Sequence, residues 1–353
     1  MSEISASIGG YVCGSGAGPL VVNRIFDRPL KADPAKILIV SFSNPGDVIL
    51  SMPCYRRLQR VFPDAVIDIA VGVESEQLMQ AFDLQGDVIV TPSKKTISQR
   101  IRFFSLILKS RYDLIVDLRN SYFGLAAKFG SGIFSPRNKS VHRRDGNLEH
   151  LDRLGIHNPA VLPDAPDAHR AAVGKPYNVS IAPGSKSDLK RYPTSSFAIL
   201  ADRLIEAGCV IHWVGSQSDT QVIREIQSLM SADSECLAGT LSWKEFRHHL
   251  ESAHLLITND SAPLHLADDI GCPVIALFGP TDHKLYGPQR SYSSSLRSDV
   301  ACRPCAKAQC QKNQRDCLEL ISPETVFNEA VKILDLSGAN QFAGGASVCK
   351  NKK

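Results

Sequence analysis

The feature of this sequence that most constrains its fold is an alternation of short apolar runs with longer segments of helical periodicity. The segment KILIVSF, from Lys36, contains a continuous apolar run, as in a strand buried on both faces, and a turn and a helical pattern through Phe62 follow it. Further strands are expected near residues 65–71, 87–90 and 114–117, with helices near 75–82 and 97–109 between them. Strands and helices in turn predict parallel βαβ units.

A second series of the same kind begins at YNVSIAPGS. Helices are expected over residues 194–207, 219–230, 242–252 and 261–270, and strands over 210–214 and in HLLITND and PVIALFG. The stretch 158–176 between the two series contains four prolines and no apolar period, which is typical of a linker. The sequence therefore predicts an α/β chain with two doubly wound halves.

The length of the chain supports this division. Its 353 residues exceed the size at which one hydrophobic core usually stops growing, so two domains are expected. We assign residues 35–157 to an N-terminal domain and 177–336 to a C-terminal domain. Residues 1–34 are rich in Gly, Ser and Ala without periodicity and are expected to form a poorly ordered extension, and 337–353 a tail.

Composition and charge exclude several classes of protein. The formal net charge of the chain, +4, is modest and the basic residues are spread along the sequence, so the composition does not favour nucleic acid binding. No stretch approaches the roughly 20 apolar residues that a membrane span requires. The N-terminus shows no charged region followed by an apolar one, as a secretory signal would. A cytoplasmic protein without a transmembrane segment is expected.

Three loops that leave a strand toward a helix carry the polar residues of interest, because ligands of open α/β sheets bind beyond the carboxyl ends of the strands. In SNPGDV, Asp47 follows Gly46 at the start of a helix, where an acid favours the helix dipole whether or not it has a chemical role. In TNDSAPLHLA, Asp260 and Ser261 stand at a strand-to-helix junction. They fit either a phosphate site or a plain helix cap.

The third loop, APGSKSDLKRYP, carries the cations Lys186, Lys190 and Arg191 between a Gly and a Pro that starts a helix. Cations and turn residues in one strand-exit loop are suited to a diphosphate. Solvated surface lysines have the same pattern, so the residues alone leave both interpretations open.

The sequence around these loops resembles a known family. ILIVSFSNPGDVILSMPCYRRLQRVFPDAVIDIAV resembles the opening of the ADP-heptose:lipopolysaccharide heptosyltransferases, glycosyltransferase family nine. Three later blocks resemble segments of that family in the same order: SVHRRDGNLEHLDRLGI, APGSKSDLKRYPTSSFAILADRL and NDSAPLHLADDIGCPVIALFGPTD. The resemblance implies a GT-B fold, in which two Rossmann-like domains face each other across a cleft. It also implies that the donor nucleotide binds the C-terminal domain and that the acceptor faces the N-terminal one.

The resemblance implies a role for individual residues. Asp47 corresponds to the general base, Lys190 to the lysine at the donor phosphates and Asp260 to the acid near the donor sugar. The other implied donor residues are Ser185, Asp219, Ser261 and His265. Two positions depart from the family pattern, since Ala262 replaces a Gly and Tyr192 a Trp, and the extra methyl of Ala262 narrows the approach of a phosphate to the helix backbone.

The expected reaction is an inverting transfer of heptose from ADP-heptose to a sugar of the lipopolysaccharide inner core. An anionic leaving group needs charge neutralisation rather than a strong acid, so one carboxylate as base suffices. No D-x-D pair stands in a suitable loop, and no divalent ion is expected to be required. A family member with another nucleotide sugar or acceptor, and a catalytically silent sugar-nucleotide-binding protein, are the alternatives.

Two further groups of residues remain open. An acid-free basic segment fits an anionic acceptor at the inner-membrane surface, and it equally fits a solvated helix face. We assign to the acceptor Lys94, Lys95, Arg100, Arg102 and Arg119. The spacing C-x2-C-x4-C-x6-C can bind a structural zinc ion as four thiolates, or these can be reduced loop cysteines; they are Cys302, Cys305, Cys310 and Cys317.

Overall fold

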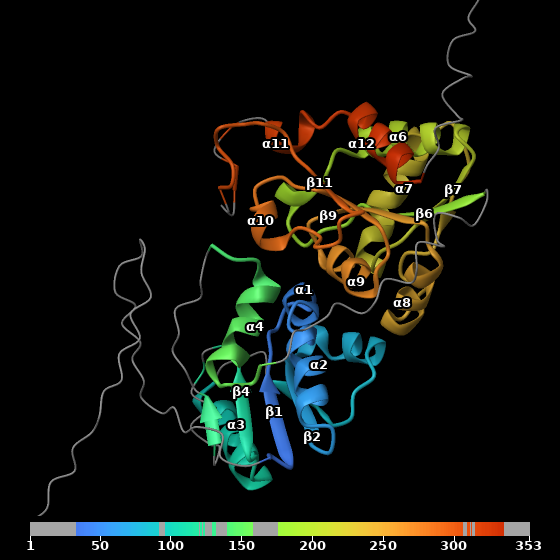
Figure 1. Cartoon of the computed structure of the whole chain (residues 1–353). Coiled ribbons are helices and arrows are strands. Elements are labelled where there is room, and N and C mark those ends of the chain that lie inside the picture. Colours follow the sequence, from blue (N-terminus) through green and yellow to red (C-terminus); the bar gives the residue numbers. More distant parts are fainter. Residues whose placement is uncertain are drawn as a thin grey trace, which may run out of the picture.

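The structure, a computed structural model, describes residues 33–91, 96–119, 121, 123, 129–131, 140–157, 176–305, 309–310, 312 and 315–334. Two parallel sheets, each flanked by helices, lie one above the other in Figure 1. The predicted α/β class with two doubly wound halves is confirmed. The predicted extension, linker and tail lie outside the described residues, apart from Asp33, Pro34 and Pro176.

The first sheet has the strand order β3-β2-β1-β4-β5, and all of its strand pairs are parallel. The chain builds outward from β1 through β2 to β3 and then crosses back to the other side of β1. Its direction of winding therefore reverses between β1 and β4, where Val40 pairs with Asp117. The strands are β1 (Lys36–Val40), β2 (Val66–Gly72), β3 (Val88–Thr91), β4 (Leu114–Asp117) and β5 (Phe129–Ser131).

The second sheet has the order β11-β10-β9-β6-β7-β8, again with every pair parallel. Here the winding reverses between β6 and β9. The strands are β6 (Tyr177–Ala182), β7 (Cys209–Trp213), β8 (Glu235–Cys236), β9 (Leu255–Asn259), β10 (Val274–Leu277) and β11 (Ser294–Leu296). Strands β5, β8 and β11 were not predicted, because two or three residues are too short to show a periodicity.

The predicted helices of the first half differ from the observed ones in two places. The helix expected through Phe62 is divided into α1 (Pro45–Ile49) and α2 (Met52–Val61). Pro53 explains the break, because it has no N–H to donate to the carbonyl of Ile49 and its ring clashes with that carbonyl in a continuous helix. The helix expected over 75–82 is a pair of short 3-10 helices, η1 (Val73–Ser75) and η2 (Gln77–Ala81). The remaining helices of this half are α3 (Ile97–Ser110) and α4 (Arg143–Arg153).

The four helices predicted in the second half agree with the observed ones to within a residue or two at each end. They are α6 (Thr194–Glu206), α7 (Thr220–Leu229), α8 (Trp243–Ser252) and α9 (Ala262–Ile270). Helix α12 (Pro323–Ile333) was not predicted, and the remaining elements are short: η4 (Asp188–Lys190), η5 (Gln217–Asp219), α10 (His283–Tyr286) and α11 (Asp316–Glu319). Among the described residues, none of these helices combines the length and the apolar character that crossing a bilayer demands.

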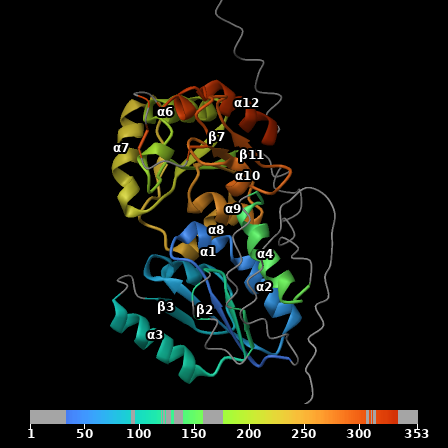
Figure 2. The same ribbon diagram turned by 90° about the vertical axis from the view of Figure 1, so that its left-hand side faces the viewer.

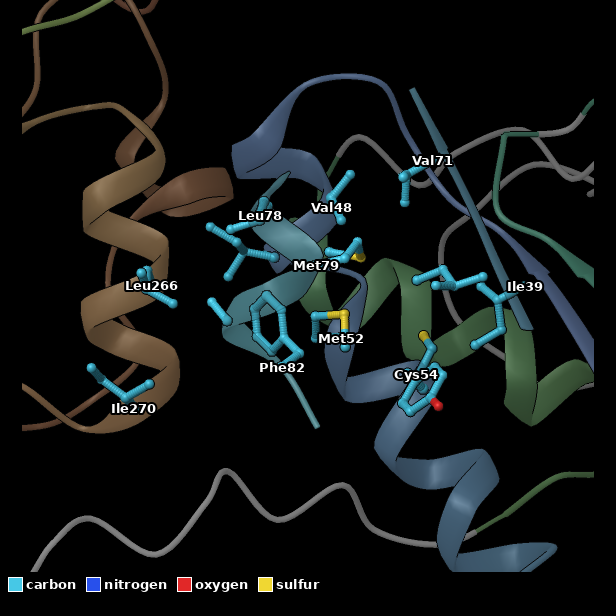
Figure 3. Close-up of a cluster of buried hydrophobic side chains, with 14 of the residues drawn as sticks. Ile39, Val48, Met52, Cys54, Val71, Leu78, Met79, Phe82, Leu266 and Ile270 are labelled. Atoms are coloured by element: carbon cyan, nitrogen blue, oxygen red, sulfur yellow. The ribbon is translucent and has the colours of Figure 1, made fainter. Parts of the chain in front are cut away.

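One hydrophobic cluster joins the two halves. Helices α8 and α9 of the second half lie against α1 and η2 of the first half (Figure 2). Figure 3 shows Leu266 and Ile270 of α9 facing Leu78, Met79 and Phe82, and all five side chains are buried in the same cluster. The contact between the halves is therefore apolar at its centre, like the interior of a domain.

Candidate functional site

The three loops singled out in the sequence lie at the two places where the winding reverses. SNPGDV follows β1, beside the end of β4, and APGSKSDLKRYP and TNDSAPLHLA follow β6 and β9. A crevice for ligands is expected at such a switch point. Helix α1, in the first of these loops, packs against α9, which begins in the third, so the two switch points face each other.

Lys190 and Asp260 form the polar centre of the second half. The ammonium of Lys190 donates to Oδ2 of Asp260 at 2.7 Å, and the hydroxyl of Thr281 donates to the same oxygen at 2.6 Å. The Asp260 side chain is 4% exposed and that of Lys190 is 30% exposed. Lys190 therefore reaches the surface while Asp260 holds its ammonium in place, and among the described residues two of its three N–H donors have no other hydrogen-bond partner. Thr281 was not assigned a role, although it stands near the end of the block NDSAPLHLADDIGCPVIALFGPTD.

Asn259 ties the lysine loop to the aspartate loop. Its carbonyl oxygen accepts from the backbone N–H of Tyr192 at 3.0 Å, and its amide donates to the carbonyl of Pro183 at 2.7 Å. The guanidinium of Arg191 donates to the carbonyl of Ser185 at 3.0 Å, and Ser185 is itself buried. Two sequence blocks about 70 residues apart thus form one rigid platform.

The start of α9 does not have the side-chain cap that the sequence allowed as the alternative to a phosphate site. Ser261 holds the N-cap position, yet among the described side chains none accepts a hydrogen bond from the first N–H groups of this helix. The Ser261 hydroxyl lies 3.4 Å from Oγ1 of Thr258 and from the carbonyl of Asn259, and the Asp260 carboxylate faces Lys190 instead. The helix dipole and these N–H groups favour an anion at this end of α9.

Asp47 lies in the first turn of α1, partly exposed. Its carboxylate has a long contact, 3.4 Å, with the Asn44 amide, and within the described chain no side chain caps this helix. Beside it, a methyl group on Gly46 would lie 3.0 Å from Cδ2 of His265, tighter than most such contacts, so glycine lets α1 and α9 approach closely here.

His265 is near both acids. Burial lowers its pKa below the usual value, and the carboxylates of Asp260 and Asp47 act in the opposite direction. The ring is therefore neutral at neutral pH. One acid from each half, the aspartate predicted as base and the one predicted at the donor sugar, thus comes near one buried side chain.

Asp219 has a mainly local role in this structure. Its carboxylate accepts from the backbone N–H of Ser216 at 2.8 Å and from the Ser216 hydroxyl at 2.7 Å, as part of a capping box. It also lies so close to Gly184 and Gly215 that neither position has room for a side chain. The residue follows β7, and its carboxylate lies against Gly184 of the loop after β6.

The residues predicted to bind the acceptor are described only in part. Lys94 and Lys95 lie outside the described residues, and so does the side chain of Arg100. Arg102 is exposed on α3, which Figures 1 and 2 place at the side of the first sheet away from the second. Arg119 follows β4, and its backbone N–H donates to Asp117 at 3.1 Å. Of the described members of this set, Arg119 lies beside the loop of Asp47, because β4 pairs with β1.

The four clustered cysteines are free thiols, and Cys302 and Cys310 are exposed. Burial raises the pKa of Cys317, and the nearby Cys302, Cys305 and Cys310 raise it further, so the four lie in one neighbourhood. Within the described part of the chain, however, no three His, Cys, Asp or Glu side chains are gathered closely enough to hold a metal ion. The zinc site stays a prediction.

Asp117 is a buried acid that the sequence analysis did not assign. It ends β4, is fully buried, and accepts from the backbone N–H of Arg119 and from the hydroxyl of Ser121. Burial raises its pKa to about 6, against these hydrogen bonds, which lower it. Its position after the strand run LIVD was the available signal.

The start of α4 joins the two halves at a second place. Nε2 of His142 donates to the carbonyl of Gly287 at 3.0 Å, and its Nδ1 accepts from the backbone N–H of Arg144 at 3.3 Å. Arg143 donates to the hydroxyl of Tyr286 at 3.0 Å. The block SVHRRDGN, which the sequence showed only to resemble a family segment, is thus a contact between the halves.

Two ion pairs also cross between the halves. Arg56 of α2 binds Asp269 of α9 through both carboxylate oxygens, and Asp269 is buried. Lys186 and Glu74 form the second pair at 2.9 Å, with side chains 79% and 55% exposed. The first pair lies in a region of low dielectric and the second is exposed to solvent, so the two pairs contribute differently to the stability of the fold.

Comparison with known proteins gives a consistent result. Residues 150–315 match the model of glycosyltransferase family 9 (heptosyltransferase). The chain is 22% identical to lipopolysaccharide heptosyltransferase 2 of Escherichia coli (strain K12) over 342 residues, 85% of this chain and 98% of that protein. It is 25% identical to lipooligosaccharide heptosyltransferase 2 of Campylobacter jejuni over 313 residues, 82% of this chain and 95% of that one.

Solved structures agree in fold. The glycosyl transferase family 9 protein from Veillonella parvula superposes with a TM-score of 0.72 at 21% identity, covering 87% of this chain and 99% of that one. The E. coli heptosyltransferase WaaC with ADP gives a TM-score of 0.63 at 18% identity, covering 84% and 99%. The resemblance and the GT-B fold expected from the sequence are both confirmed.

Proposed function

Because this chain is a glycosyltransferase with a family 9 domain, we propose that it transfers a heptose from ADP-heptose to a sugar of the lipopolysaccharide inner core, with inversion. The relatives in the comparison support this choice by their names, which are those of lipopolysaccharide and lipooligosaccharide heptosyltransferases. Two of the solved structures carry ADP or an ADP-heptose analogue. The reaction takes place at the cytoplasmic face of the inner membrane.

The observation that carries the proposal is the arrangement of Lys190, the uncapped start of α9 and Asp47 around the facing switch points. Lys190 and the N-terminus of α9 offer positive charge to a departing diphosphate from one half of the molecule. Asp47 offers a partly exposed carboxylate from the other half. Donor and acceptor functions are thereby divided between the two halves.

In the proposed reaction, Asp47 takes the proton from the acceptor hydroxyl as the new glycosidic bond forms at the anomeric carbon. ADP leaves from the opposite face, and the ammonium of Lys190 stabilises the negative charge that collects on its phosphate oxygens. Asp260 keeps Lys190 oriented for this purpose. No divalent ion takes part, since the fixed cation and helix N-terminus supply the neutralisation.

A direct test incubates the full chain with ADP-heptose and a heptose-deficient inner-core acceptor and follows the acceptor by mass spectrometry. We expect one heptose to be added and the product to have the inverted anomeric configuration. A thermal-shift panel of ADP, UDP and GDP sugars identifies the donor, because preferential binding to the folded state raises the melting temperature. Stabilisation by a UDP or GDP sugar alone, or donor binding without transfer to any core acceptor, would refute the proposal.

A further inference from the structure

Helix α3 presents a large apolar surface to solvent. Of the twelve exposed large hydrophobic residues in the described part of the chain, four are on this helix: Ile97, Ile101, Leu106 and Leu108, with exposed fractions of 77%, 59%, 47% and 48%. Scattered exposed hydrophobic residues are normal, but a group of this size on one element marks an interaction surface.

Three of these four residues form a stripe that is separate from the packed face of the helix, and Leu106 lies on another side of it. Phe103 and Ile107 are buried against the first sheet. Ile97, Ile101 and Leu108 follow one another at i, i+4 and i+11, which places them on one line about 120° around the helix axis from the buried pair. The core therefore accounts for one apolar face of α3, and the second has no partner among the described residues.

Basic residues accompany this stripe. Arg102 and Lys109 are exposed on the same helix, which also carries Arg100 and has no acidic residue along its length. A second copy of α3 would bring like charges together across the contact, which disfavours a symmetric dimer. Anionic lipid headgroups complement the charges, and their acyl chains complement the stripe.

We propose that the stripe of Ile97, Ile101 and Leu108, with Lys109 and Arg102 beside it, docks the N-terminal half of the protein flat on an anionic lipid bilayer. The helix lies on the outer side of the first sheet, away from the second half (Figures 1 and 2), so docking leaves the contact between the halves undisturbed. The inference rests on the proposed function in one respect: an acceptor anchored in a membrane makes such docking useful.

Sedimentation of the full chain with lipid vesicles tests the proposal without any turnover. We expect binding to vesicles of phosphatidylcholine mixed with an equal part of phosphatidylglycerol, weaker binding at high salt, and little binding to phosphatidylcholine alone. The variant Ile97→Gln/Ile101→Gln/Leu108→Gln keeps good helix formers on exposed positions and should bind at least about tenfold more weakly. Lys109→Gln should weaken binding by about fivefold.

The matched control is Ile199→Gln/Leu229→Gln, which removes two residues, each 53% exposed, from α6 and α7 of the second half. It should bind vesicles as the unmodified chain does. With a soluble, deacylated core acceptor the triple variant should retain unmodified turnover, so loss of docking is distinguishable from failure of the proposed reaction. Unchanged vesicle binding in the triple variant would overturn the proposal. So would a dimer, found by analytical ultracentrifugation, that the triple substitution dissociates while no vesicle binding is seen.

Discussion

Lys190 and Asp260 are joined by a hydrogen bond of 2.7 Å between two loops that leave neighbouring strands of the second sheet. The buried carboxylate fixes the position of the more exposed ammonium, so the cation is oriented before any ligand arrives. Preorganisation of this kind lets one charged group act without rearrangement during the reaction.

Lys190→Ala should therefore remove about 2 to 4 kcal/mol of transition-state stabilisation, and kcat/KM should fall accordingly. The loss should lie mainly in kcat, because charge on the diphosphate grows as the bond to the sugar breaks. Lys332→Ala, which removes a lysine 72% exposed on α12, serves as the control and should be neutral. Steady-state kinetics with ADP-heptose decide the matter, and unmodified turnover in Lys190→Ala would exclude the assigned role.

Asp47→Asn should reduce turnover by about 10² to 10⁴, the range that a general base supplies, while donor affinity is retained. The amide keeps the size of the side chain but cannot take a proton. If Asp47 merely favours the dipole of α1, the variant instead loses about 0.3 to 1 kcal/mol of stability and the folded enzyme keeps its rate. Single-turnover rates and melting temperatures separate the two outcomes, with Asp64→Asn, at an exposed position, as the control.

The buried interdomain pair of Arg56 and Asp269 should matter more than the exposed pair of Lys186 and Glu74. Asp269→Asn leaves a guanidinium with an incomplete partner in a place of low dielectric and should cost about 1 to 3 kcal/mol in the free energy of unfolding. Glu74→Gln should cost about 1 kcal/mol or less. Denaturant unfolding of both variants measures the difference. Equal losses would mean that the burial of Asp269 contributes nothing.

His142 should make the stability depend on pH. Burial lowers its pKa from the ordinary value of 6.5 to about 4 in the folded state, so between these values the unfolded chain takes up a proton that the folded chain does not. The stabilising contribution is present above pH 6.5 and is lost as the pH falls through this window. In His142→Gln, the slope of unfolding free energy against pH should be shallower by about 1.4 kcal/mol per pH unit. Parallel slopes for the two proteins, measured by denaturant unfolding, would contradict this.

Prolonged treatment with a chelator should leave the initial rate intact, because the proposed reaction uses Lys190 and a helix N-terminus rather than a divalent ion. Restoration of a chelator-inactivated enzyme by magnesium or manganese would exclude that mechanism. A melting temperature that falls while the rate of the folded protein is maintained would support a structural zinc ion at the four cysteines, since bound metal stabilises only the folded chain. Metal analysis of the purified protein completes the test.

Much of the fold could be predicted because its strands are buried on both faces. Runs such as LIVD and PVIALFG identify central parallel strands, and β4 has the predicted bounds of residues 114–117. The break at Pro53 was also visible in the sequence, though the prediction passed over it. Edge strands such as β8 could not be found, because β8 has only two residues and forms through pairing with the adjacent strand rather than through a pattern of its own.

The site could be predicted less completely than the fold. Strand-exit motifs marked Asp47, Lys190 and Asp260, and the structure places all three around the facing switch points. Thr281 stands in the same sequence block as Asp260, but its hydrogen bond to Asp260 depends on tertiary structure, which the block alone does not show. For Asp219, the resemblance implied a contact with the donor, whereas in the structure its carboxylate is part of a capping box.

The apolar cluster shared by η2 and α9 limits how this enzyme can be recombined with its relatives. A hybrid that joins the first half of this chain to the second half of another protein would have an interface whose two sides come from different proteins and do not fit each other. Leu266 and Ile270 would have to be transplanted together with Leu78, Met79 and Phe82. Because Val48, in the loop after β1, belongs to the same cluster, the two halves would have to be exchanged as one unit.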